Sequence, residues 1–356
     1  MSGRRTSSRL RVLRSSLLKS PQKSSEKTPA KPTPYSRPGR KCASKDPEGK
    51  TKSKPIETNE QKTSKSTSKG NDKQSRQALP DVPPIQPTTV PERSQLIEII
   101  ENTPGCRCGS LLIMDILVMT LEGATAILTS DRDNESVNAL YREGGEERTS
   151  TLPTSQCLTN FTIIEDNLVA AGVWCQFKIV FFKVFPDLDL QRTIDTKMRY
   201  SSIAFLSPGT LVGGHVMGSG GVDVLDMSGN ILRTFDGRHY SGPYSVCTYN
   251  GNCIVGDAKN LAIMCFNDRG DLLFTFKPRA NKKFVGFLTV TSHGGYIYAS
   301  DREGQRVVQL TSDGKYVRDV LTREDGIKEP QGICITDDNL LYVSVLNSYI
   351  RVYRIG

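Results

Sequence analysis

Residues 327–356 read IKEPQGICITDDNLLYVSVLNSYIRVYRIG, and this stretch decides the fold. A first short apolar run follows Pro330-Gln331-Gly332, a second covers 340–345 and a third contains Ile350, Val352 and Tyr353. Runs rich in β-branched and aromatic residues, separated by short polar turns, are typical of antiparallel hairpins. Three such strands leave an unpaired edge, so the sequence predicts that a strand from elsewhere completes the unit.

The same pattern recurs upstream at a regular spacing. Aligning the ends of the second strands, with intervals of 41, 43, 42, 44 and 44 residues, places six positions in register: Asp131, Gly172, His215, Asp257, Asp301 and Val345. A third apolar strand follows each position, and four of these strands precede a glycine where a tight reversal needs positive φ: Gly144, Gly229, Gly270 and Gly314. A period near 43 residues with four strands per repeat predicts propeller blades.

Six repeats between Ile116 and Gly356 predict an all-β, six-bladed propeller in which the last blade lacks its outer strand. We expect the isolated apolar run QLIEII, within residues 94–101, to supply that strand and close the ring. An open blade edge would leave backbone groups unpaired. A loose terminal helix or strand is the alternative interpretation of this run.

Charge divides the chain into two parts. Residues 1–91 hold 21 basic and 7 acidic residues, whereas the remainder holds 26 and 31. Residues 1–93 are rich in Ser, Lys, Pro and Thr and contain Tyr35 as their single aromatic residue. They cannot bury enough apolar surface to offset the entropy of ordering, so we expect a disordered basic tail. One propeller domain, residues 94–356, is expected to follow it.

The tail and the cysteines bear on localisation. Arg4 to Lys19 contains no acid and has leucines at roughly helical spacing, which leaves a presequence, a nuclear import signal, a membrane-surface helix and a solvated tail open. Nine cysteines lack paired ligand spacing, so we expect mostly buried free thiols, with no metal and no cofactor. An odd cysteine number without an apolar secretory segment predicts a cytoplasmic protein, with the nucleus left open by the basic tail. The sequence predicts no transmembrane segment and leaves the oligomeric state undetermined.

The repeats resemble NHL repeats. The segments GICITDDNLLYVSVLNSYIRVYRIG, GYIYASDREGQRVVQLTSDGKYV and AILTSDRDNESVNALY carry this resemblance. More narrowly, residues 94–356 are similar to the C-terminal propellers of the tripartite-motif (TRIM-NHL-like) family. The aspartate common at the end of the second strand in that family is kept in three repeats and replaced in three, by Gly172, His215 and Val345. We find no counterpart of the family's RING, B-boxes or coiled coil, so its ubiquitin-ligase activity is not carried over.

The sequence does not favour an enzyme. His215, His239 and His293 fall in three different repeats, and neither a G-x-S-x-G nor an H-E-x-x-H motif is present. Some propellers are hydrolases with a metal in the central channel, and Asp257 and Asp301 are candidate ligands for one. Turn capping explains both aspartates more simply.

The loops between repeats are the predicted binding site. Connections from a fourth strand to the next first strand share one face of a propeller, and three of them carry basic and aromatic residues: Lys197, Arg199, Tyr200, Arg238, His239, Tyr240, Arg279, Lys282 and Lys283. Cations pair with phosphates or carboxylates, and exposed rings stack on bases. We therefore expect RNA or an acidic protein segment as the partner. In the alternative interpretation, the rings of Tyr200, Tyr240 and Phe284 pack beneath the loops and the cations are merely solvated.

The sequence thus predicts a non-catalytic platform that binds RNA or protein through one propeller face. One alternative is an adaptor that binds substrate proteins for ubiquitination. The other is a propeller hydrolase with a channel metal.

Overall fold

The computed structural model describes residues 93–101, 112–154, 158–278, 289–345 and 349–356. The predicted tail, apart from Arg93, lies outside this part of the chain. Arg279, Lys282 and Lys283, three residues of the predicted site, lie outside it as well.

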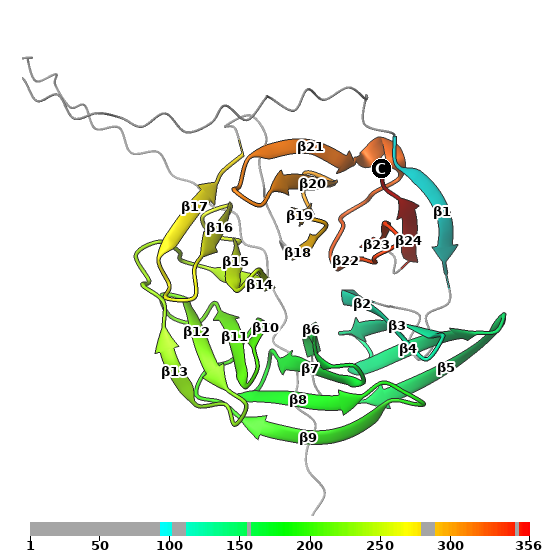
Figure 1. The fold of residues 1–356 in the computed structure, drawn as a ribbon, viewed down its shortest axis with the longest axis horizontal. Helices are drawn as coiled ribbons and strands as arrows, with labels where there is room; N and C mark the ends of the chain where they lie inside the picture. Colours follow the sequence, from blue (N-terminus) through cyan, green and yellow to red (C-terminus); the bar gives the residue numbers. More distant parts are fainter. Residues whose placement is uncertain (1–92, 102–111, 155–157, 279–288, 346–348) are drawn as a thin grey trace, which may run out of the picture. The chain divides into compact units, whose positions relative to one another are not determined.

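The described residues form six antiparallel sheets of four strands, arranged as blades around a central axis (Figure 1). This confirms the predicted six-bladed propeller. Blade 1 contains β2 (Ile113–Leu121), β3 (Ala124–Asp131), β4 (Ser136–Glu143) and β5 (Glu146–Pro153). Blade 2 contains β6 (Leu158–Glu165), β7 (Leu168–Val173), β8 (Lys178–Lys183) and β9 (Asp189–Asp195). Blade 3 contains β10 (Ser202–Ser207), β11 (Thr210–His215), β12 (Gly221–Asp226) and β13 (Ile231–Thr234).

The second half of the ring repeats this order. Blade 4 contains β14 (Pro243–Tyr249), β15 (Asn252–Asp257), β16 (Ala262–Phe266) and β17 (Leu272–Phe276). Blade 5 contains β18 (Val290–His293), β19 (Tyr296–Asp301), β20 (Arg306–Thr311) and β21 (Tyr316–Leu321). A single 3-10 turn, η1 (Arg323–Asp325), precedes blade 6 and is the one helical element of the described residues. No described helix is long and apolar enough to cross a membrane.

Blade 6 is built from both ends of the propeller sequence. It contains β22 (Ile333–Ile335), β23 (Leu340–Val345), β24 (Tyr349–Arg354) and, as its outer strand, β1 (Gln95–Ile100). Strand β1 runs antiparallel to β24, with Gln95 opposite Arg354 and Ile100 opposite Ile350 (Figure 1). Both oxygens of Glu98 in β1 accept hydrogen bonds from the Arg142 guanidinium of blade 1 at 2.9 and 2.5 Å. The closing strand is therefore held by blade 1 as well as by blade 6.

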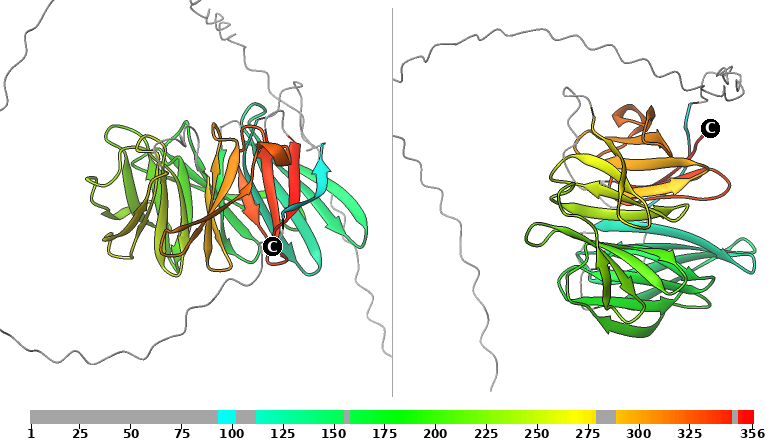
Figure 2. Two further views of the ribbon diagram at one scale, coloured as in Figure 1. Left: turned by 90° about the horizontal axis from the view of Figure 1, so that it is seen from above. Right: turned by 60° about the vertical axis from the view of Figure 1, so that its left-hand side comes forward.

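The antiparallel order assigns each connection to one of two ends, which a side view separates (Figure 2). Connections within the first and second hairpins of a blade, from strand one to two and from three to four, share one end, which we call the turn face. Connections from strand two to three, and from each blade to the next, share the other end, which we call the loop face. The described members of the predicted binding site all belong to connections of the loop face.

The strand pairing corrects the predicted register at one blade. In blade 1, Asp131 pairs with Ser136, the first residue of the third strand. In blade 2 the third strand begins at Lys178, which pairs with Val173 and not with Gly172. The six register positions are therefore spaced by 42, 42, 42, 44 and 44 residues. Gly172 occupies the preceding position, which is Gly or Ser in every blade: Ser130, Gly172, Gly214, Gly256, Ser300 and Ser344.

This preceding position is small because neighbouring blades meet there. A Cβ atom at Gly172 would lie 3.0 Å from the Tyr200 carbonyl oxygen of the next blade. Where serine is present, its hydroxyl joins two blades: Ser130 Oγ accepts from the Asp115 N–H and donates to the Thr159 carbonyl, each at 3.0 Å. Ser344 makes the equivalent contacts across the seam between blades 6 and 1.

The first strands surround a central cavity of about 170 Å³ and are joined by side chains. Backbone groups that face a neighbouring blade cannot join its sheet, so side-chain oxygens accept their hydrogen bonds. In each case a side chain of one blade accepts from a backbone N–H of the next: Asp115 from Phe161 at 2.8 Å, Asn160 from Ile203 at 2.7 Å, Ser202 from Val246 at 2.8 Å, and Ser245 from Val290 at 3.2 Å. Polar side chains of the first strands therefore line the central channel.

The described cysteines are unpaired thiols. Cys253, Cys265 and Cys334 are buried and Cys247 is half-buried, in agreement with the predicted core role. Cys175 is exposed and departs from it.

Candidate binding face

Two of the predicted binding residues belong to the core. The ring of Tyr200 is fully buried, and its hydroxyl donates to Oδ2 of Asp223 at 2.8 Å. Tyr240 is also buried, and its hydroxyl donates to the Phe235 carbonyl at 2.7 Å. The prediction that these rings offer stacking surfaces is wrong, because both hydroxyls and both rings are used in packing beneath the loops.

The remaining described members of the predicted site stay at the surface. Lys197 and His239 are exposed. Arg199 is half-buried and lies with its guanidinium 4.9 Å from the ring centroid of Phe177. The Arg238 side chain is 83% exposed and pairs with Asp236 of its own loop at 2.5 Å. The structure thus retains the cations of the predicted site and removes its tyrosine rings.

An aromatic contact that the sequence interpretation missed lies on the same face. The ring of Trp174, between β7 and β8, lies 6.0 Å from the ring of Tyr244 in β14. The contact joins blade 2 to blade 4 and therefore reaches past blade 3. Trp174, Phe177 and Met217 are 38, 43 and 41% exposed, although all three are large and apolar. Trp174, Phe177, Met217 and Tyr244 all lie on the loop face, and we call this set of side chains the aromatic cluster.

Two arginines lie in connections of the same face. Arg132 follows β3 of blade 1 and Arg302 follows β19 of blade 5. Burial raises the pKa of Tyr244, and the positive charges of Arg132 and Arg302 oppose that rise.

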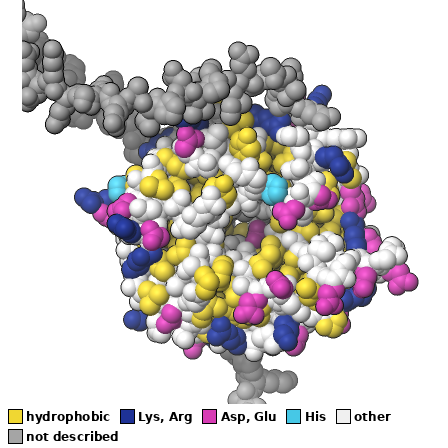
Figure 3. All heavy atoms as spheres, in the orientation of Figure 1, with side chains coloured by type: hydrophobic (Ala, Val, Ile, Leu, Met, Phe, Trp, Pro, Cys, Tyr) yellow, Lys and Arg dark blue, Asp and Glu magenta, His cyan; other side chains and the backbone are white. Residues whose placement is uncertain are grey.

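Charge on the described connections of the loop face is nearly balanced. The bases are Arg132, Lys197, Arg199, Arg238, Lys259, Lys277, Arg302, Arg323 and Lys328, and the acids are Glu101, Asp133, Glu135, Asp236, Glu303, Glu324, Asp325 and Glu329. Figure 3 draws the opposite side, the turn face at which β24 ends, and there Lys and Arg lie mostly around the circumference. The balance of charge gives no continuous basic surface on the described part of the loop face.

The aspartates at the register position cap turns. Oδ1 of Asp257 accepts from the N–H groups of Lys259 and Asn260 at 2.9 Å, and Oδ2 accepts from Ser241 N–H at 2.7 Å. Asp301 accepts from Gly304 N–H at 2.8 Å and pairs with Arg306 at 3.0 Å. The predicted capping role is confirmed, and both carboxylates are used in it. Within the described ranges no group of three His, Cys, Asp or Glu side chains is arranged to hold a metal.

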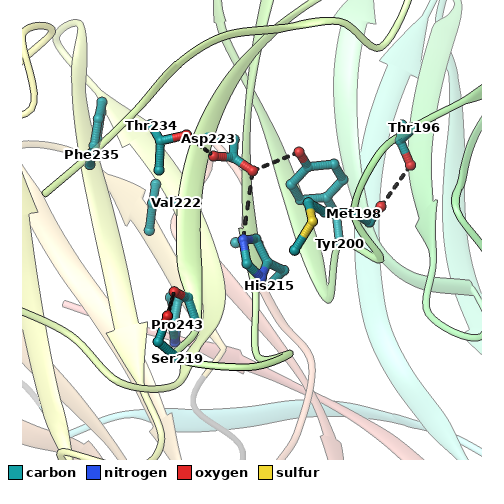
Figure 4. A network of polar contacts seen from close by, with 12 residues as sticks. Thr196, Met198, Tyr200, His215, Ser219, Val222, Asp223, Thr234, Phe235 and Pro243 are labelled. Carbon is teal, nitrogen blue, oxygen red and sulfur yellow. Dashed lines mark hydrogen bonds and ion pairs between the residues drawn. The ribbon is translucent and has the colours of Figure 1, made fainter. Parts of the chain in front are cut away.

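In blade 3 a buried network replaces this cap (Figure 4). His215 occupies the register position, and its Nε2 lies 3.6 Å from Oδ2 of Asp223, which also accepts from Tyr200. Thr234 donates to the other oxygen of Asp223 at 2.5 Å. Desolvation lowers the pKa of His215, and the charge of Asp223 opposes this. Tyr200, His215 and Asp223 are buried among packed strands, so these contacts hold blade 3 together.

The fold is thus a six-bladed propeller, and an aromatic contact between blades 2 and 4 lies on its loop face. No protein-family profile matches the sequence. The E3 ubiquitin-protein ligase TRIM56 of Mus musculus is 24% identical over 242 residues, which cover 65% of this chain and 32% of TRIM56. The Homo sapiens protein of the same name is 21% identical over 240 residues. The predicted resemblance to tripartite-motif propellers is thus confirmed, although the chain spans about a third of these relatives.

Solved propellers with quite different roles share the fold. Virginiamycin B lyase from Staphylococcus aureus is 13% identical, with a TM-score of 0.53 over 73% of this chain and 99% of the lyase. The propeller domain of Myceliophteria thermophila Swd1 is 12% identical, with a TM-score of 0.51 over 74% of this chain and all of that domain. At these identities the likeness shows the fold alone.

Proposed function

We propose that this chain is a protein-interaction propeller that binds a partner protein through its loop face, with the aromatic cluster at the centre of contact. The contact between Trp174 and Tyr244 is the observation that carries the proposal. It joins the partly exposed ring of Trp174 to Tyr244 across two blades, on a face where Phe177 and Met217 are also partly exposed. Trp, Tyr, Arg and Met are enriched at the energetic centres of protein interfaces, where a few side chains supply most of the affinity.

A protein is a better partner than RNA for this face. Binding of RNA relies on cations that neutralise successive phosphates, and on rings that stack against bases. The described loops carry acids in nearly equal number to bases, and the rings of Tyr200 and Tyr240 are buried. Since the relatives named above are ubiquitin ligases, we include a protein destined for ubiquitination among the proposed partners.

The test compares two single substitutions in the full-length chain. Trp174→Ala removes the centre of the aromatic cluster, whereas Leu232→Ala removes a leucine that is 57% exposed on the outer strand β13. Crosslinking in cells, followed by purification with and without nuclease, identifies the bound molecules. We expect partner proteins that resist nuclease, are lost from Trp174→Ala and are retained by Leu232→Ala.

Two results would contradict the proposal. Recovery of partners that vanish on nuclease treatment would favour the RNA platform instead. Equal recovery of partner proteins by both variants would place the contact away from the aromatic cluster.

A further inference from the structure

We infer that the central channel binds a linear aliphatic polyamine, with one ammonium group paired with Asp115 and another held by acids at the turn-face end of the channel. The inference goes beyond the proposed function, because it uses the channel and the turn face and none of the side chains of the aromatic cluster. Three observations carry it: a buried carboxylate, a lining of hydrogen-bond acceptors and an acidic channel end.

The channel contains one charged side chain among its described lining residues. First-strand segments of all six blades surround its cavity of about 170 Å³, and these residues include no Lys, Arg or His. Asp115 is 6% exposed, and its Oδ2 accepts from Phe161 N–H at 2.8 Å. Burial raises the pKa of this carboxyl to about 7, because desolvation penalises a negative charge that no neighbouring cation offsets. A cationic ligand would supply the missing positive charge.

The hydroxyl groups of the lining favour a ligand that donates hydrogen bonds. Thr248 Oγ1 donates to the Phe205 carbonyl at 2.8 Å, and Ser292 Oγ donates to the Thr248 carbonyl at 3.0 Å. A hydroxyl whose proton is used in this way keeps its lone pairs as acceptors. Ammonium groups are donors, so they suit this lining, whereas a carboxylate or phosphate ligand would meet acceptors.

The turn-face end of the channel is acidic. The first strands surround the channel, so the turns from first to second strands lie nearest to it, and we call these six described connections the inner turns. They contain no Lys or Arg, and their acids come from blades 6, 1 and 2, which are neighbours in the ring: Glu122, Asp166, Asp337 and Asp338. Figure 3 views this face and shows acidic side chains near its centre. Their field would attract a polycation to this end of the channel.

The distance between the buried carboxylate and the inner turns selects the kind of cation. Ser245 occupies in β14 the position that Asp115 occupies in β2, and β14 ends four residues later at Tyr249. At about 3.3 Å per residue, the end of the channel lies roughly 13 Å from the carboxylate. A lysine side chain inserted from this end is too short to reach Asp115, and an inorganic ion occupies one position alone. An extended polyamine such as spermidine carries ammonium groups at both ends of a slender chain and therefore reaches both acidic positions.

The test is a calorimetric titration of the full-length protein with spermidine at pH 8, above the pKa of about 7 of the Asp115 carboxyl. We expect Asp115→Asn to weaken binding about tenfold, since a hydrogen bond between charged groups is lost. Asp268→Asn is the matched control: it removes an exposed acid from the turn between β16 and β17, away from the channel, and should leave the affinity unchanged.

A second ligand tests the unaltered protein, so the result does not depend on how a variant folds. Spermidine acetylated at both terminal nitrogens keeps the chain but loses both terminal charges. It should bind at least about tenfold more weakly than spermidine, because each lost ion pair removes a charge-assisted hydrogen bond.

Three results would overturn the inference. An affinity for spermidine that Asp115→Asn leaves unchanged, or that Asp268→Asn lowers equally, would assign binding to surface charge. Equal binding of the diacetylated derivative would remove the role of the ammonium groups. Complete displacement of spermidine by an equal concentration of Mg²⁺ would assign the channel to an inorganic ion. Trp174→Ala should bind spermidine as the parent chain does, so failure here leaves the proposed function intact.

Discussion

The hydroxyl of Tyr200 donates a 2.8 Å hydrogen bond to Oδ2 of Asp223 in the third strand of the same blade. This bond fixes the connection that enters blade 3, and the ring covers Gly213, where a Cβ atom would lie 2.5 Å from Cδ1 of Tyr200. Tyr200, which the sequence assigns to the binding surface, therefore stabilises blade 3 by linking the connection before β10 to β12. The position of Arg199 and Lys197 on the loop face depends on it.

Replacement of Tyr200 by phenylalanine should lower stability without removing the binding surface. The substitution leaves Oδ2 of the buried Asp223 without its tyrosine donor, so we expect the free energy of unfolding to fall by about 1–3 kcal/mol. Urea denaturation measures this change. Tyr316→Phe is the control, because Tyr316 is 47% exposed and its bond to Asp319 is at the surface. An equal loss of unfolding free energy in the two variants would contradict the stabilising role assigned to the Tyr200–Asp223 hydrogen bond.

Asp115 should make stability depend on pH. Desolvation raises the pKa of its carboxyl from 3.8 to about 7, so the folded protein retains a proton that the unfolded chain releases. Between roughly pH 4 and pH 7 the folded state binds more protons, and the free energy of unfolding should fall as pH rises, by up to about 1.4 kcal/mol per unit. Denaturation at pH 5 and pH 8 measures the slope.

Asp115→Asn should remove this slope while keeping the fold. Asn160 in blade 2 shows that an amide oxygen serves the same position, because it accepts from Ile203 N–H at 2.7 Å. The variant should be more stable than the parent chain above pH 7. A slope unchanged by the substitution would assign the pH dependence to another group.

Substitution of Gly332 should weaken the seam between blades 6 and 1. A Cβ atom there would lie 2.6 Å from the Cα atom of Asp115, and backbone cannot move aside as a flexible side chain can. We expect Gly332→Ala to reduce the free energy of unfolding by about 2–3 kcal/mol. Gly237→Ala is the matched control, since a Cβ atom at Gly237 meets no atom within 4 Å. Thermal unfolding curves that coincide for the two variants would show that the seam tolerates the methyl group.

The cations of the loop face should differ in their importance for binding. Arg199 lies over the Phe177 ring beside the aromatic cluster, whereas Arg238 is 83% exposed and paired with Asp236. Exposed ion pairs contribute about 0–1 kcal/mol, so Arg238→Ala should change partner affinity little. Arg199→Ala should weaken it several-fold in a titration with the captured partner. A larger effect at Arg238 would move the contact towards blade 4.

Most of the fold could be predicted from the period of the sequence repeat. Strands of similar length returned every 42–44 residues, and only a propeller accommodates six such units in one closed ring. The register at Gly172 could not be read from LVAAGV, because every residue of that strand is small or apolar and its pairing partners define the position. Asp131, Asp257 and Asp301 were recognisable because a polar side chain at a strand end has few roles other than capping.

The described residues of the predicted site lie in connections at one end of the blades, as expected from the repeat, but the rings of Tyr200 and Tyr240 are buried. Side chains in irregular loops follow no simple alternation, so the inward direction of Tyr200 and Tyr240 could not be deduced. Connections from second to third strands were left out, although the same topology places them on the loop face. The single tryptophan of the chain, Trp174, lies in one of these connections and was the available signal.

The pairing of β1 with β24 has a mechanical consequence. Gln95 lies opposite Arg354, so the chain enters β1 and leaves β24 at the same end of the ladder. Tension applied between these two points would load one hydrogen bond at a time, and the strands would peel apart as a zipper opens. If the two points lay at opposite ends of the ladder, all of its hydrogen bonds would bear the force together. We therefore expect β1 to separate from β24 at low pulling force, and the pairing of Gln95 with Arg354 to break first.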